Sequence, residues 1–88
     1  AAYAASVHPE DLARVAREVE GHAAAGARAF DQEYRIVRPD GEVRWLYDHT
    51  IVARDERGAV THYEGYVFDV TALERERRTR TNAERKLL

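Results

Sequence analysis

Apolar and polar residues alternate along three consecutive stretches of the chain, as they do in strands whose two sides face different surroundings. The stretches cover residues 29–38, 42–54 and 59–70. They are rich in β-branched and aromatic residues and are bounded by Gly, Pro and Asp. The pattern predicts a three-stranded antiparallel meander joined by two tight turns.

The two turns set which side chains lie opposite one another. Residues 39–41, Pro-Asp-Gly, suit a type I turn followed by a left-handed glycine, so we expect Arg38 to pair with Glu42. Residues 55–58 are interpreted as a four-residue loop. The pairs expected across the second and third strands are Arg54 with Ala59, Thr50 with Tyr63, Asp48 with Gly65, Leu46 with Val67, and Arg44 with Asp69.

Strict alternation then divides the side chains between two faces. One face is expected to carry Phe30, Gln32, Tyr34, Ile36, Leu46, Asp48, Thr50, Val52, Tyr63, Gly65 and Val67. The other is expected to carry Glu33, Arg35, Val37, Val43, Trp45, Tyr47, Tyr66 and Phe68. Neither set is plainly polar, so both faces need a cover, one from a helix and the other from a partner or another segment.

A helix is predicted on each side of the meander. Residues 8–11, His-Pro-Glu-Asp, are typical of a helix start, and apolar residues at helical spacing continue the helix over 9–25. These residues are Leu12, Val15, Ala16 and Val19. Thr71 followed by Glu74 is a capping-box pattern that opens a second, mostly charged helix over 71–88. Alone, that helix is expected to be marginal in water.

Composition narrows the classes of function. The 88 residues suffice for one small domain, and the net charge of −2 gives no general attraction to nucleic acid or anionic lipid. The Arg-rich final helix also contains Glu residues, which favours a solvated helix over a nucleic-acid site. No apolar run approaches the about 20 residues of a membrane span, and we expect a cytosolic setting. The absence of Met suggests a fragment of a longer protein.

Three segments in this order resemble the C-terminal half of a PAS domain of the PAS fold-3 type with its PAC motif. They are HPEDLARV at 8–15, EYRIVRPDGEVRWL at 33–46 and GYVFDVTALERER at 65–77. The resemblance implies an α+β fold with a five-stranded antiparallel sheet, of which this chain supplies the last three strands. Residues 59–70 would then have a bare edge, so we expect a homodimer, an exchanged strand, or additional N-terminal residues.

The resemblance also implies a ligand pocket over the first face of the sheet. Its candidate residues are Tyr34, Ile36, Leu46, Asp48, Thr50, Tyr63, Gly65 and Val67. Gly65 opposite Asp48 would leave a gap beside a carboxylate, suited to a small polar ligand. The alternative is that the first helix fills this face and Asp48 bonds a backbone donor or water.

Two further groups of residues have expected roles. Arg44, Asp69 and Thr71 are candidates for signal relay, because an Arg44–Asp69 ion pair would tie the middle strand to the start of the second helix; alternatively the pair is an ordinary surface contact. The second face is a candidate interface, with Trp45 beside Phe68 and Tyr47 beside Tyr66. The alternative is that these rings pack under a segment absent from this chain.

The sequence leaves the ligand unknown but argues against several cofactors. Without Cys, a cysteinyl–flavin adduct is excluded, as are Cys metal sites. Haem-binding members of the family ligate iron through a mid-helix His, whereas His8 and His22 lie near the ends of the first helix. His49 and His62, with Glu64 nearby, lack a recognisable metal-ligand spacing, and polar cross-strand contacts are favoured over a metal site.

We therefore expect a sensory module in which residues 1–70 bind a small ligand or a sister subunit and residues 71–88 carry the change to an absent effector. The resemblance implies a bacterial signalling protein such as a histidine kinase or a cyclic-dinucleotide enzyme. The alternative is a ligand-free dimerisation module. An enzyme has little support, because no nucleophile and base can be assembled from these residues.

Overall fold

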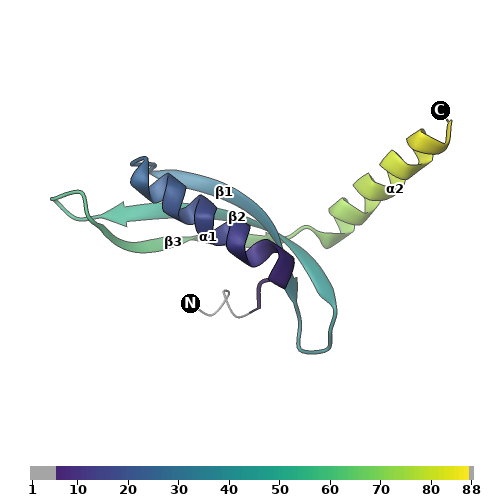
Figure 1. The fold of residues 1–88 in the computed structure, drawn as a ribbon, viewed down its shortest axis with the longest axis horizontal. Coiled ribbons are helices and arrows are strands. Elements are labelled where there is room, and N and C mark those ends of the chain that lie inside the picture. Colours follow the sequence, from purple (N-terminus) through teal and green to yellow (C-terminus); the bar gives the residue numbers. More distant parts are fainter. Residues whose placement is uncertain (1–5, 88) are drawn as a thin grey trace.

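The computed structural model describes residues 6–87 as a helix, a three-stranded antiparallel sheet and a second helix (Figure 1). The elements are α1 (Pro9–Ala24), β1 (Ala29–Val37), β2 (Val43–Arg54), β3 (Val60–Asp69) and α2 (Thr71–Leu87). The α+β fold is therefore confirmed, and each boundary lies within one residue of its prediction. Residue 88, the end of the predicted second helix, lies outside the described residues.

The first hairpin has the predicted turn and register. The Gly41 N–H donates to the Arg38 carbonyl at 2.8 Å, and the Arg38 N–H donates to the Glu42 carbonyl at 2.9 Å. Gly41 has a φ of +87°, which glycine adopts without steric cost. The resulting pairs of β1 with β2 include Gln32 with Asp48 and Tyr34 with Leu46.

The second hairpin differs from its predicted register by two residues. Asp55 pairs with Ala59 around a three-residue loop, because the Asp55 carboxylate accepts the N–H groups of Arg57 and Ala59 and draws Asp55 into the turn. A bulge beside Arg54 then adds another residue on β3. The observed pairs are Thr50 with Gly65, Asp48 with Val67, and Leu46 with Asp69. A shift of two keeps each side chain on its predicted face.

The helix α1 covers the first face of the sheet, as its apolar stripe predicts (Figure 1). His8 caps it, since its Nδ1 accepts the Glu10 N–H at 3.1 Å, and Pro9 takes the first helical position. The core under the start of the helix is small. It consists of buried Val7, Tyr34 and Leu46, with Val15, Ile36 and Val67 packed against them.

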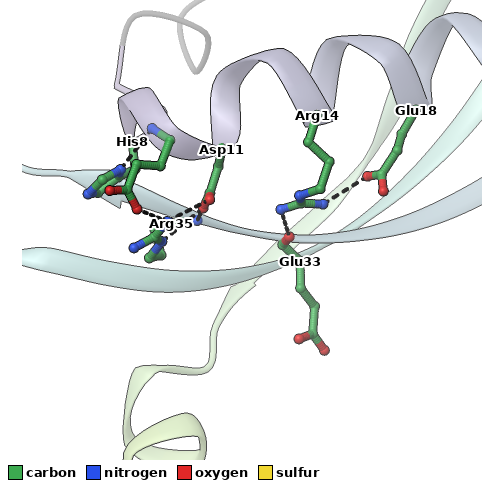
Figure 2. A network of polar contacts seen from close by, with 7 residues as sticks. His8, Asp11, Arg14, Glu18, Glu33 and Arg35 are labelled. Carbon is green, nitrogen blue, oxygen red and sulfur yellow. Dashed lines mark hydrogen bonds and ion pairs between the residues drawn. The ribbon is translucent and has the colours of Figure 1, made fainter.

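Polar side chains fasten α1 to β1 (Figure 2). The Asp11 carboxylate accepts the backbone N–H of Arg35 at 2.8 Å and two guanidinium hydrogen bonds at 2.7 and 3.0 Å. One turn further along, Arg14 donates to the Glu33 carbonyl at 2.7 Å and to Glu18 at 3.0 Å. The position of the helix over the sheet is therefore set by charged contacts as well as by its apolar stripe.

The helix α2 begins at the end of β3 and projects away from the sheet (Figure 1). Its first turn contacts β2, and the rest extends the molecule to 55 Å in its longest dimension. Neither of the two helices in the described part of the chain is long and apolar enough to cross a membrane.

Candidate functional site

A cavity of about 420 Å³ lies between α1 and the sheet. The whole predicted stripe of α1, Leu12 to Val19, forms one wall, together with Val7 and Glu20. The opposite wall comes from the sheet. Its residues are Phe30, Gln32, Tyr34, Asp48, Thr50 and Tyr63. The helix therefore covers this face without filling it.

The structure distributes the eight predicted pocket residues over three places. Four line the cavity, namely Tyr34, Asp48, Thr50 and Tyr63. Gly65 and Val67 line a neighbouring hollow of about 430 Å³, which shares the last three of those residues. Ile36 and Leu46 belong to the packed core and line neither space. The cavity thus includes half of the predicted pocket residues and adds Phe30 and Gln32 from β1.

Asp48 is the polar centre of the cavity. Its Oδ2 accepts the Tyr34 hydroxyl at 2.6 Å, and its Oδ1 accepts the Thr50 hydroxyl at 2.9 Å. Both oxygens of Asp48 thus have a side-chain partner, which neither of the alternatives considered from the sequence included. The alternation of the strands placed Tyr34, Asp48 and Thr50 on one face, so the sequence pattern could have indicated this cluster. Its hydrogen bonds were not predicted.

The pairing predicted for Gly65, opposite Asp48, is wrong. Gly65 lies opposite Thr50, not Asp48, and a Cβ at Gly65 would lie 1.9 Å from the His49 carbonyl oxygen. Its φ of +154° also lies in a region that side chains disfavour. Glycine is required here because the backbones of β2 and β3 approach closely, a constraint that the sequence pattern does not reveal.

The start of α2 is fastened to the central strand by the three predicted relay residues. Arg44 Nε donates to Asp69 Oδ2 at 2.8 Å, although the backbone partner of Asp69 is Leu46. Asp69 Oδ1 accepts the Thr71 N–H at 2.9 Å and the Thr71 hydroxyl at 2.6 Å. The guanidinium of Arg44, followed by the Thr71 donors, lowers the pKa of Asp69 to about 2.

Thr71 connects this joint to the backbone of β2. Its side chain is 1% exposed, and its Oγ1 accepts the Trp45 N–H at 2.8 Å. The Val70 N–H donates to the Trp45 carbonyl, also at 2.8 Å. Two hydrogen bonds to one residue of β2 thus hold the junction between β3 and α2.

The predicted capping box at the start of α2 is wrong, although the helix begins at Thr71 as expected. The Thr71 hydroxyl is engaged with Asp69 and Trp45, and the Glu74 carboxylate binds Arg77 and Arg78 instead of an N-terminal N–H. Arg77 is the main cause of the lowered pKa of Glu74. The Thr71 side chain therefore makes a tertiary contact with β2 instead of capping α2.

Two cations cover Trp45 on the second face of the sheet. The guanidinium groups of Arg35 and Arg78 lie 5.5 and 4.8 Å from the centre of its ring. Both distances are within the range of a cation–π contact. Arg35 is bound to α1 and Arg78 belongs to α2, so Trp45 is partly covered by its own chain.

The other three predicted interface residues form pairs different from those expected, owing to the register shift. Tyr47 lies opposite Phe68, and His49 stacks on Tyr66 at 5.0 Å. Tyr66 and Phe68 contact each other at 5.2 Å and remain 50% and 58% exposed. Exposed Ile51 adjoins them on the same face. Of the four predicted interface residues, only Tyr66 and Phe68 thus belong to an exposed apolar patch, together with Ile51.

The four histidines make local polar or stacking contacts. His49 bonds Asp31 at 2.5 Å and His62 bonds Glu64 at 3.1 Å. His8 caps α1, and His22 stacks on Phe30 at 4.7 Å. Within residues 6–87, no three His, Asp or Glu side chains are grouped as a metal site requires.

A helix over an antiparallel sheet, a cavity between them, and a second helix that begins at the end of β3 define a small α+β domain. A protein-family model described as PAS fold matches residues 1–67. The chain therefore belongs to the PAS fold family.

The relatives include a methyl sulfide methyltransferase-associated sensor of Methanosarcina acetivorans, 38% identical over 78% of this chain. An uncharacterised protein of Sinorhizobium fredii is 31% identical over 80% of the chain. The chain spans only 7% and 8% of the lengths of these two proteins. The resemblance thus concerns one domain within much longer sequences.

Two solved structures have the same fold. The N-terminal domain of a diguanylate cyclase with a PAS/PAC sensor from Marinobacter aquaeolei aligns with a TM-score of 0.73 and 29% identity, covering 82% of this chain and 65% of that one. A sensory box histidine kinase/response regulator from Burkholderia thailandensis aligns with a TM-score of 0.82 and 27% identity, covering 93% and 62%. These relatives carry the domain in signalling proteins.

Proposed function

We propose that this chain is a non-catalytic sensory module that binds a small molecule in the cavity beneath α1 and passes the change through α2 to an effector. One observation carries the proposal: a single strand, β2, contributes to both sites. Asp48 and Thr50 line the cavity, and Trp45, three residues before Asp48, holds Thr71 at the start of α2. A ligand that moves β2 by a fraction of an ångström would act directly on the joint.

The relatives support this assignment. The sensor, the histidine kinase and the diguanylate cyclase are named as signalling proteins, and each contains a similar domain. By analogy, residues 71–88 would lead to a kinase or a cyclase, and the expected cytosolic, bacterial setting stays a prediction. The relay would run from Arg44 through Asp69 to Thr71, as their hydrogen bonds suggest.

A second candidate function is a dimerisation module without a ligand. It is favoured by the exposed patch of Tyr66, Phe68 and Ile51, and by β3, whose outer edge is unpaired within residues 6–87. Exposed apolar patches and bare strand edges are both common sites of association. The two candidates differ in whether the cavity holds a molecule in the cell.

Native mass spectrometry of the full-length protein, purified without added ligand, separates them. We expect additional mass that disappears on denaturation and that is lost in an Ala16→Phe variant, since Ala16 lines the cavity. Ala13→Phe, on the exposed side of the same helix, should keep the additional mass. Bare dimers of the unsubstituted protein would favour the dimerisation module instead, and bare monomers would contradict both.

A further inference from the structure

Around Asp48, the neighbouring side chains of the cavity have already used their hydrogens. The hydroxyls of Tyr34 and Thr50 both donate to Asp48. The Gln32 amide nitrogen donates to the Val15 carbonyl and to Glu18 Oε1, each at 3.1 Å. The remaining hydroxyl of the lining belongs to Tyr63, which is 46% exposed. A ligand that reaches Asp48 therefore meets oxygen lone pairs, so the polar group that contacts Asp48 has to supply hydrogens.

The charged residues of the lining also favour a ligand that donates hydrogen bonds. Its acidic residues are Asp48, at the polar centre, and Glu20, an exposed residue of α1. Among the side chains that the structure describes, no Arg, Lys or His lines the cavity. A carboxylate or phosphate placed here would face Asp48 without a compensating cation, which is unfavourable in a partly buried site.

Asp48 can accept further hydrogen bonds from a ligand. An ionised carboxylate offers about four lone-pair sites, and the two hydroxyls occupy one on each oxygen. A charged donor on the remaining sites makes a hydrogen bond stronger than a neutral one. The apolar wall, formed by Leu12, Val15, Val19 and Phe30, would receive the rest of the molecule.

We propose that the ligand of this cavity is a small cationic amine with an apolar body, bound through its ammonium group to Asp48. The proposal rests on the sensory function proposed above and specifies its ligand class. It excludes carboxylic acids and phosphorylated compounds as primary ligands, because Asp48 would repel them.

Three probes that share one ring and differ in the head group test this proposal. Benzylamine, benzyl alcohol and benzoate are titrated into the full chain at constant ionic strength and pH 7, and amide chemical shifts are followed by NMR. We expect benzylamine, which is an ammonium at this pH, to bind at least tenfold more tightly than benzoate, with the alcohol between them. Shifts should centre on Tyr34, Asp48 and Thr50.

Asp48→Asn removes the charge and keeps the shape of the side chain. We expect it to weaken benzylamine binding about tenfold and to leave benzyl alcohol within about threefold. Asp31→Asn, which removes a carboxylate on the other face of the sheet beside His49, should change neither. The comparison of the three probes on the unsubstituted chain remains decisive if Asp48→Asn does not fold.

The outcomes distinguish the ligand class from the function. Benzoate binding as tightly as benzylamine, or benzylamine binding unchanged in Asp48→Asn, would overturn the amine assignment while leaving a usable cavity. If none of the three probes binds in the cavity, the amine assignment fails, and the proposal that this chain senses a small molecule fails with it.

Discussion

At the scale of single residues, the ion pair between Asp11 and Arg35 joins α1 to the sheet. The Asp11 side chain is 11% exposed, and the hydrogen-bonded Arg35 guanidinium lowers its pKa from 3.8 to about 2. A carboxyl group whose pKa is lower in the folded chain stabilises the fold above its unfolded pKa. This contribution disappears as the pH falls from about 4 toward 2.

We therefore predict that Asp11→Asn lowers the free energy of unfolding at pH 7 by about 1–2 kcal/mol. The free energy of unfolding of this variant should also decrease less between pH 4 and 2. Urea unfolding at several pH values measures both effects. Asp69, with its pKa also near 2, should preserve part of the acid sensitivity. Glu56→Gln in the exposed second turn is the control, and equal acid profiles for both variants would contradict the role of Asp11.

A second prediction concerns the close approach of two strands at Gly65. Gly65→Ala should destabilise the chain by more than about 2 kcal/mol, because its Cβ would collide with the His49 carbonyl. A Cβ at Gly21 in α1 would meet nothing within 4 Å, so Gly21→Ala should instead stabilise the chain by about 0.5–1 kcal/mol. Thermal and urea unfolding of the pair measures the contrast; similar values would refute the steric argument.

At the scale of elements, alternation and helical spacing predicted all five elements and the division of side chains between the two faces. The register of β2 with β3 was not predictable in this way. It depends on whether Asp55 closes the turn and on a bulge beside Arg54, and neither changes the hydrophobic pattern. Four of the eight pocket residues predicted from the sequence line the cavity, but the space left under α1 depends on packing that no periodicity encodes.

The joint between β3 and α2 gives a prediction at this scale. Thr71→Val leaves the Trp45 N–H without its acceptor and should cost about 1–3 kcal/mol, the usual cost of an unsatisfied buried donor. Hydrogen exchange at Trp45 and in the first turn of α2 should become faster. Thr81→Val is the matched control, because the Thr81 hydroxyl bonds a carbonyl of its own helix. Unchanged exchange at Trp45 would contradict the role of the Thr71 hydroxyl in holding β2 to the start of α2.

At the scale of the whole molecule, much of the second face of the sheet remains uncovered. If a second copy covers it, sedimentation velocity will show a mass that increases with concentration. Phe68→Asp should then prevent the increase, because it places a charge in the exposed patch. Ala59→Asp, at the distant turn, should leave association unchanged. A chain that stays monomeric at high concentration would rule out this face as a self-interface.

The most direct test of the proposed coupling is hydrogen exchange in the Ala16→Phe and Ala13→Phe variants. Both alanines are exposed on α1, but Ala16 lines the cavity and Ala13 does not. The phenyl ring introduced by Ala16→Phe would therefore occupy the cavity as a ligand would. We predict altered exchange at Trp45, Thr71 and Glu74 in the Ala16 variant alone. If those amides exchange as in the unsubstituted chain while amides around the cavity change, β2 does not couple the cavity to α2.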